Sequence, residues 1–188
     1  MALAFAGNGT ITGLSVGGLP DGVIQAADLA SGVGGKVLQV VSTVKTDTFQ
    51  STANSWTDVT GMSVSITPAS GTKVLVTCTA TIGHRDTYYA YVRLVRDSTA
   101  IAVGTASGSR EPATWNLSCG SDNYESFSYA MTYLDTHSAD GSTAVNYKLQ
   151  FNSATNSGEV SLNRSYTDSN NAYTGRYAST ITAMEIGA

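Results

Sequence analysis

The sequence predicts an all-β protein: an antiparallel β-sandwich or jelly-roll domain that follows an extended, glycine-rich N-terminal arm. Three observations lead to this prediction. After residue 36, apolar and polar residues alternate with a period of two in several segments, which is typical of half-buried antiparallel strands. Strong helix formers such as Glu, Lys and Gln are scarce, whereas Thr, Val, Ile and Tyr are plentiful. Residues 7–35, by contrast, contain glycine at short intervals, which is typical of an extended segment and not of a strand or helix.

The arm, residues 1–35, has too little apolar bulk to bury a core of its own. Single apolar residues stand between its glycines, and it contains no Lys, Arg or Glu. We expect it to be extended, with one helical turn over 21–29, and to bury its side chains against neighbouring chains, so that it serves both for attachment and for trimerisation. Six residues are the candidate anchors for attachment to a larger particle: Leu14, Val16, Leu19, Pro20, Ile24 and Leu29.

The β-domain, residues 36–188, is expected to consist of about ten short strands. In chain order these are 36–44, 56–66, 74–81, 89–96, 99–104, 113–119, 126–133, 146–152, 159–164 and 177–186. The alternation is clearest in the strands at 74–81, 126–133 and 146–152. Turn-forming clusters lie between strands at 68–71, 139–142, 156–158 and 168–171. Short strands separated by polar turns predict two packed antiparallel sheets.

Composition excludes several classes of protein. Ten Lys and Arg residues on a chain of net charge −4 cannot neutralise many phosphates, so we expect no nucleic acid as a partner. No apolar run is long enough to span a bilayer, so no membrane insertion is expected. The N-terminus lacks the basic region of a secretory signal. His84 and His137 lie far apart without zinc-ligand spacing, so we expect neither a metal nor a cofactor.

Several patterns resemble catalytic or metal sites, but each has an ordinary interpretation. Residues 13–17 match G-x-S-x-G, yet no buried strand precedes them and no βαβ unit follows. His84 lies near Asp86 and His137 near Asp135, without an identifiable nucleophile. The candidate carboxylates for polysaccharide hydrolysis are Glu111, Asp122, Glu125, Glu159 and Glu185. The candidate oxygen ligands for calcium lie in Asp140–Ser142 and Asp168–Asn171. Both sets fit solvated loops and ordinary turns better. We therefore predict that the protein is not an enzyme.

Cysteine and tyrosine leave two questions open. Cys78 and Cys119 both fall in expected strands, where they are either buried thiols or a disulfide between facing strands. Tyrosine is abundant, with ten residues, and Tyr88, Tyr89 and Tyr91 form a cluster. Exposed tyrosines on a loop rim suit contact with a surface glycan. The favoured alternative is that tyrosines fill sheet faces and subunit contacts.

Four segments resemble virion proteins of tailed bacteriophages. Residues 17–30 look like a segment common in tail-fibre and head-fibre proteins. Residues 36–47 resemble the opening of the β-domain that follows it there, 94–99 a recurrent internal strand, and 175–186 the closing strand. The resemblance implies a non-enzymatic virion protein that forms a homotrimer, and it brings no catalytic residue with it.

The leading hypothesis is a capsid decoration or head-fibre protein on the virion surface, made in the host bacterial cytoplasm. Only about 35 residues, beginning with Met1, precede the β-domain, whereas a tail fibre usually needs a long docking region. The expected partners are copies of the chain itself and phage capsid proteins, or tail proteins. The alternative is a receptor-binding tail-fibre or tail-tip protein that recognises host surface glycan, and a third hypothesis is a polysaccharide depolymerase.

Overall fold

The computed structural model describes residues 4–5, 11–12, 36–85, 89–117, 122–155 and 158–187. The chain divides into two compact units, residues 1–36 with residue 188, and residues 37–187. In the first unit, β1 (Ala4–Phe5) pairs antiparallel with β2 (Ile11–Thr12). The helical turn expected at 21–29 and all six candidate anchors lie outside the described residues.

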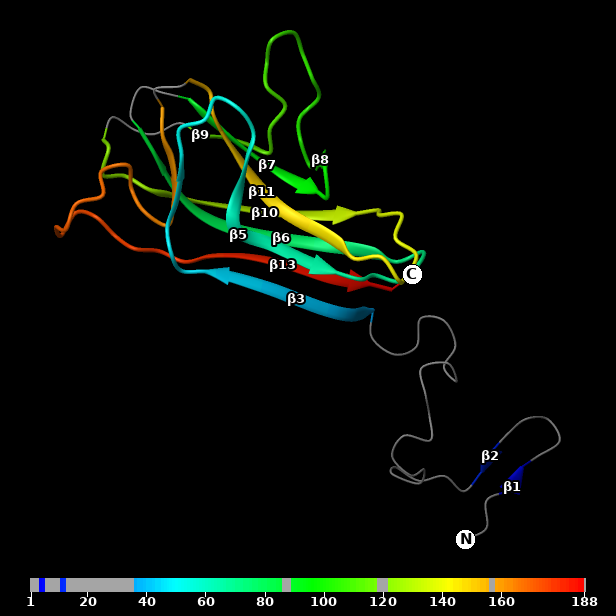
Figure 1. Cartoon of the computed structure of the whole chain (residues 1–188). Coiled ribbons are helices and arrows are strands. Elements are labelled where there is room, and N and C mark those ends of the chain that lie inside the picture. Colours follow the sequence, from blue (N-terminus) through cyan, green and yellow to red (C-terminus); the bar gives the residue numbers. More distant parts are fainter. Residues whose placement is uncertain are drawn as a thin grey trace. The chain divides into compact units, whose positions relative to one another are not determined.

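The second unit is an antiparallel β-sandwich, as the alternation predicted (Figure 1). Its first sheet contains β3 (Val37–Lys45), β4 (Phe49–Ser51), β6 (Lys73–His84), β10 (Phe127–Asp135), β12 (Val160–Leu162) and β13 (Ser179–Ile186). The long strand β6 lies at its centre, with β10 along one edge and with β13 and β12 end to end along the other. Beyond them, β3 pairs with β13 and β4 pairs with β12.

The second sheet contains β5 (Thr57–Ile66), β7 (Ala90–Arg96), β8 (Thr99–Ile101), β9 (Trp115–Leu117) and β11 (Val145–Ser153). Its order is β5-β11-β7-β8, and β9 pairs with the other half of the β7 edge. With β3-β13-β6-β10 in the first sheet, this is the strand order of a jelly roll, in which the chain passes repeatedly from one sheet to the other. The described residues contain no helix.

The core lies between the inner faces of the two sheets. In β6 every second residue from Val74 to Ile82 is buried, and in β11 the same is true from Val145 to Phe151. The largest fully buried side chains include Tyr147 and Phe151 of β11 and Met62 of β5. In these two strands one face is buried and the other is not, so the alternation in the sequence correctly predicted which residues face the core.

Several observed strands differ from the expected ones, and β6 continues to His84, beyond its expected end. β8 ends at Ile101, three residues early, and Ala102 has a positive φ of 53°. β4 was not predicted, because it has only three residues and pairs only with β12. β5 covers the expected range, but its register with β11 shifts between Lys148 and Gln150, and Gly61 has a φ of 81°.

Candidate functional site

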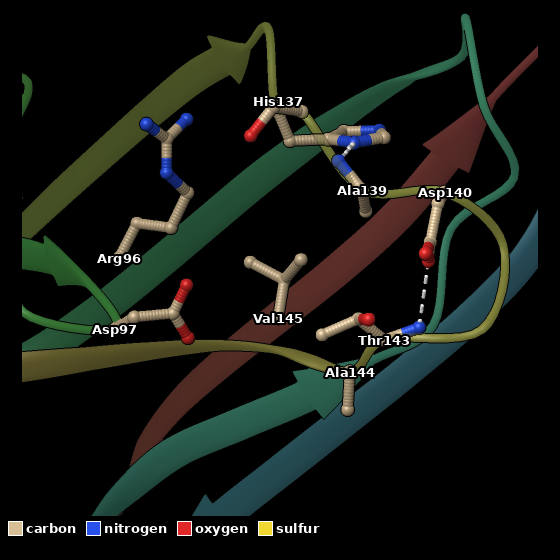
Figure 2. A pocket seen from close by; sticks show the side chains of 9 residues that line it. Arg96, Asp97, His137, Ala139, Asp140, Thr143, Ala144 and Val145 are labelled. Atoms are coloured by element: carbon tan, nitrogen blue, oxygen red, sulfur yellow. Dashed lines mark hydrogen bonds between the residues drawn. The ribbon is translucent and has the colours of Figure 1, made fainter.

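A pocket of about 180 Å³ lies beside the end of β7 and the loop that joins β10 to β11 (Figure 2). Its lining includes Arg96 and Asp97 on one side and residues 137–140 of the loop on the other. The loop closes as a tight turn, because the Asp140 carboxylate accepts the backbone N–H groups of Ser142 and Thr143 at 2.9 and 3.0 Å. These hydrogen bonds lower the pKa of Asp140. The Asp140 carboxylate is therefore used to stabilise the turn in which it lies.

Beside this pocket, three polar side chains join the two sheets. Arg96 of β7 donates from Nη1 to both carboxylate oxygens of Asp135 of β10, each at 2.9 Å. The hydroxyl of Tyr147 of β11 donates to Asp135 Oδ2 at 2.8 Å. Burial, and then the hydrogen bond to Asp135, raise the pKa of Tyr147. Asp135 and Tyr147 are buried and Arg96 is partly exposed, and together they form a hydrogen-bonded cluster that holds β10 against β7 and β11.

His137 has a separate set of partners. Its Nδ1 accepts the backbone N–H of Ala139 at 3.1 Å, which leaves the proton on Nε2 (Figure 2). Nε2 lies 3.3 Å from the hydroxyl of Thr72, and that hydroxyl lies 3.0 Å from the buried carboxylate of Glu185. Asp135 and His137, neighbours in the sequence, are therefore held by different groups and make no His–carboxylate pair.

Several other candidates from the sequence have structural partners or lie outside the described residues. His84 is buried, and its Nδ1 lies 2.9 Å from the carbonyl oxygen of Arg85. Glu159 accepts a hydrogen bond from buried Arg164 at 2.8 Å. Burial raises the pKa of the Cys78 thiol to about 12. Outside the described residues lie residues 13–17, Asp86, Tyr88 and Cys119.

A second, more open pocket of about 370 Å³ lies on the outer side of the second sheet. It is lined by Tyr91 of β7, Asn116 of β9, and the loop between β8 and β9, which projects from the sandwich (Figure 1). We call it the Tyr91 groove; its remaining lining residues are Gly104, Thr105, Arg110, Glu111, Pro112 and Ala113. It presents an aromatic ring, an amide, a guanidinium and a carboxylate to solvent.

An aromatic side chain fixes the carboxylate at the rim of the groove. Trp56 Nε1 donates to Glu111 Oε1 at 2.7 Å, and the guanidinium carbon of Arg93 lies 4.2 Å from the centre of the Trp56 ring. Arg93 in turn donates to Gln150 at 2.8 Å. Rings, carboxylates and guanidinium groups held in fixed positions are the elements that bind sugars: the ring stacks and the polar groups bond hydroxyls.

The tyrosines named from the sequence have different surroundings. Tyr91 lines the groove, whereas Tyr89 is 62% exposed and is not among the lining residues. Sequence reasoning missed Trp56, and it considered Glu111 only as a carboxylate for polysaccharide hydrolysis. No local signal joins these two, because they are 55 residues apart in the chain and meet only through the fold.

Among the residues that the structure describes, no group of His, Cys, Asp and Glu side chains is arranged to hold a metal ion. The loop at 168–171, considered for calcium, lines an open pocket together with Thr174 and Arg176. Arg176 is paired there with Asp168. Asn171 closes the turn by accepting the backbone N–H of Tyr173 at 2.9 Å.

The outer face of the first sheet has the opposite character to the Tyr91 groove, because it carries no charge over three cross-strand rows. The rows, read from β3 through β13 and β6 to β10, are Val40–Met184–Leu75–Leu134, Ser42–Thr182–Thr77–Thr132 and Val44–Thr180–Thr79–Ala130. We call these residues the uncharged face. Val40, Val44 and Leu134 are 56%, 60% and 47% exposed, so the apolar atoms are on the surface.

Comparison with known proteins leaves the family open. No protein-family model matches the chain, and no curated protein matches its sequence. None of the described segments is a helix long and apolar enough to cross a membrane.

Proposed function

We propose that the chain is a non-enzymatic structural protein of a tailed-bacteriophage virion, a capsid decoration or head-fibre protein on the particle surface. The observation that carries this proposal is the contrast between the outer faces of the sandwich. The uncharged face suits burial in a protein assembly, and the polar face with the Tyr91 groove suits solvent. The resemblance of four segments to fibre proteins of phages supports the virion assignment and a homotrimer.

The pairing of the buried polar groups supports a structural role. Asp135 is held by Arg96, Glu159 holds Arg164, and Glu185 accepts from Thr72. Groups that satisfy one another in this way stabilise a fold, whereas a catalytic group needs room for a substrate and a proton to move.

Localisation on the particle tests the proposal directly. Antibody against the chain, bound to gold and viewed on intact phage by electron microscopy, is expected to label the capsid. Label confined to the tail would contradict the decoration role and favour the receptor-binding alternative. Absence of the chain from purified particles would refute both.

Removal of the arm gives the first prediction. A chain that starts at Gly35 is expected to fold as a soluble β-domain, because residues 37–187 form a compact unit with their own core. It is expected not to bind particles that lack the protein, because the candidate anchors Leu19 and Ile24 are gone. Binding is measured by co-sedimentation with particles, with the full chain as control. Equal occupancy by both chains would show that the arm is not the anchor.

The Tyr91 groove favours a second candidate function, recognition of a glycan on the host surface. A sugar ring can stack on Tyr91 while its hydroxyls bond Asn116, Arg110 and the carboxylate of Glu111. This function belongs to the tail-fibre alternative, but it is also compatible with a decoration protein that holds the phage near its host.

Substitution of Tyr91 tests this candidate. Tyr91→Ala is expected to weaken binding on an array of bacterial surface oligosaccharides by about tenfold or more, because the stacking surface is lost. The matched control is Tyr173→Ala, since Tyr173 is 79% exposed and lines no part of the groove. Binding that falls equally in both variants, or in neither, would rule out the groove as the glycan site.

A further inference from the structure

We propose that the uncharged face is the surface through which copies of this chain pack against one another. The inference deepens the proposed function, because it rests on the self-association proposed there and names the residues that carry it. The evidence is the chemistry of the face, its size, and the contrast with the outer face of the other sheet.

The composition of the face is unusual for a surface in water. Exposed faces of antiparallel sheets usually carry polar and charged residues in alternation with the core. Here the twelve side chains of the three rows include Val, Leu, Met, Thr, Ser and Ala, and none is charged. The described charged group nearest along β6 is Lys73, two residues before Leu75 and at the end of the strand.

The second sheet provides a comparison within the same domain. On its outer side Lys148 pairs with Asp58 at 2.7 Å, and Gln150 donates to the same carboxylate at 2.6 Å. Arg93 continues this polar network through Gln150. The same chain therefore gives one sheet a charged, solvated surface and the other an uncharged one, which is the distribution expected when only one of them is buried in an assembly.

The hydroxyl row points to a second copy rather than to a different partner. Ser42 and Thr182 already share a hydrogen bond of 2.8 Å, and each hydroxyl can both donate and accept. Three copies that turn this face toward a common axis can therefore satisfy one another's hydroxyls without any charge, while the neighbouring row from Val40 to Leu134 gives apolar contact with both neighbours. Nucleic acid and anionic lipid surfaces both call for basic side chains, which these rows lack.

The size of the face suits the centre of such an interface. Four strands about 4.8 Å apart give a width of about 19 Å, and three rows spaced two residues apart along β6, from Leu75 to Thr79, give a length of about 20 Å. The plan area is roughly 380 Å², about half of the roughly 800 Å² per partner of a standard interface, so the face forms the apolar centre and the surrounding residues form the rim. Small Thr, Ser and Ala side chains also let neighbouring sheets approach closely.

Sedimentation of the full chain in the absence of phage tests the interface. The wild-type chain is expected to sediment as a trimer of 19.5 kDa subunits. Val40→Lys combined with Leu134→Lys is expected to weaken association by roughly 100-fold or more, because lysines would be buried without partners, and to release single chains. Both positions are about half exposed, so far-UV circular dichroism should not change.

The matched control places two lysines on the other sheet. Ser65→Lys with Thr99→Lys adds the same charge at exposed positions of β5 and β8 and is expected to leave the trimer intact. A double variant at Val40 and Leu134 that keeps the wild-type mass would overturn the interface. A wild-type dimer that this variant dissociates would support the face and contradict the trimer.

Oxidation of methionine separates self-association from cover by the arm of the same chain. Met184 lies on the uncharged face, whereas Met131 packs against the core. Hydroxyl-radical labelling is expected to modify Met184 slowly in the wild type and faster in the dissociated variant, with Met131 unchanged. A wild-type monomer in which Met184 is protected would place the N-terminal arm on the face and refute the proposal. Because neither assay involves a virion, their failure is distinct from failure of particle labelling.

Discussion

We expect Asp135→Ala to lower the free energy of unfolding by about 3–4 kcal/mol. Asp135 is 2% exposed and accepts hydrogen bonds from Arg96 and Tyr147. Its removal leaves the fully buried Tyr147 hydroxyl without this acceptor and the Arg96 guanidinium without its counter-charge. The cost falls on the inter-sheet contact, because Asp135 belongs to one sheet and its two partners belong to the other.

Thermal unfolding measures this effect. At about 2–4 °C per kcal/mol for a chain of this size, the midpoint should fall by roughly 10 °C, compared at equal protein concentration. The matched control is Asp58→Ala, which removes a carboxylate whose side chain is 53% exposed. Its ion pair with Lys148 should contribute no more than about 1 kcal/mol. Equal midpoints for the two variants would show that the buried cluster contributes no special stability.

The fold class could be predicted because its cause is local in the sequence. In β6 the residues from Val74 to Ile82 alternate between apolar residues that face the core and residues on the other face. A period of two is typical of a strand with one buried face, whereas a helix has a period of 3.6. The same holds for β11, whose apolar residues all face inward. Strand β4 escaped prediction because three residues cannot display a period, and its pairing with β12 is a property of the assembled sheet.

The polar sites could not be predicted in the same way. Arg96 and Asp135 are 39 residues apart, and each lies at the end of a strand, where a charged residue is ordinarily solvated. These strand ends meet because β7 and β10 belong to the two sheets that pack against each other. The uncharged face was not recognised from the sequence, because it is formed by four strands that are distant in the chain and adjacent in the sheet.

Gly83 gives the second large effect that we expect. Gly83 lies in β6 opposite Ser161 of β12, at a point where the chain after β12 crosses close to it. A Cβ at this position would lie 2.6 Å from the carbonyl oxygen of Arg164 and 2.7 Å from Cα of Ser165. Both contacts are with backbone, so a rotation of a side chain cannot relieve them. Glycine is required here by close approach of another backbone.

The crossing segment cannot easily move away, because it is fixed on several sides. Asn163 has a φ of 61°, and its side-chain amide donates to the carbonyl oxygens of Lys45 and Asp47, each at 2.9 Å. Its backbone N–H donates to the Thr81 carbonyl at 2.8 Å. Arg164, 5% exposed, is held by Glu159. A methyl group on Gly83 therefore has to separate β6 from a segment that is bonded both to β6 and to the end of β3.

We therefore expect Gly83→Ala to destabilise the domain by about 3 kcal/mol, at the upper end of the cost of overpacking. The unfolding midpoint should fall by roughly 6–12 °C. Gly104→Ala is the matched control, because a Cβ at Gly104 would meet nothing within 4 Å. That variant should be neutral or slightly stabilising, since alanine restricts the unfolded chain more than glycine does. If both variants unfolded within 1–2 °C of the wild type, the close packing of the 163–165 segment on β6 would be wrong, because no relaxation of side chains alone can accommodate the added methyl group.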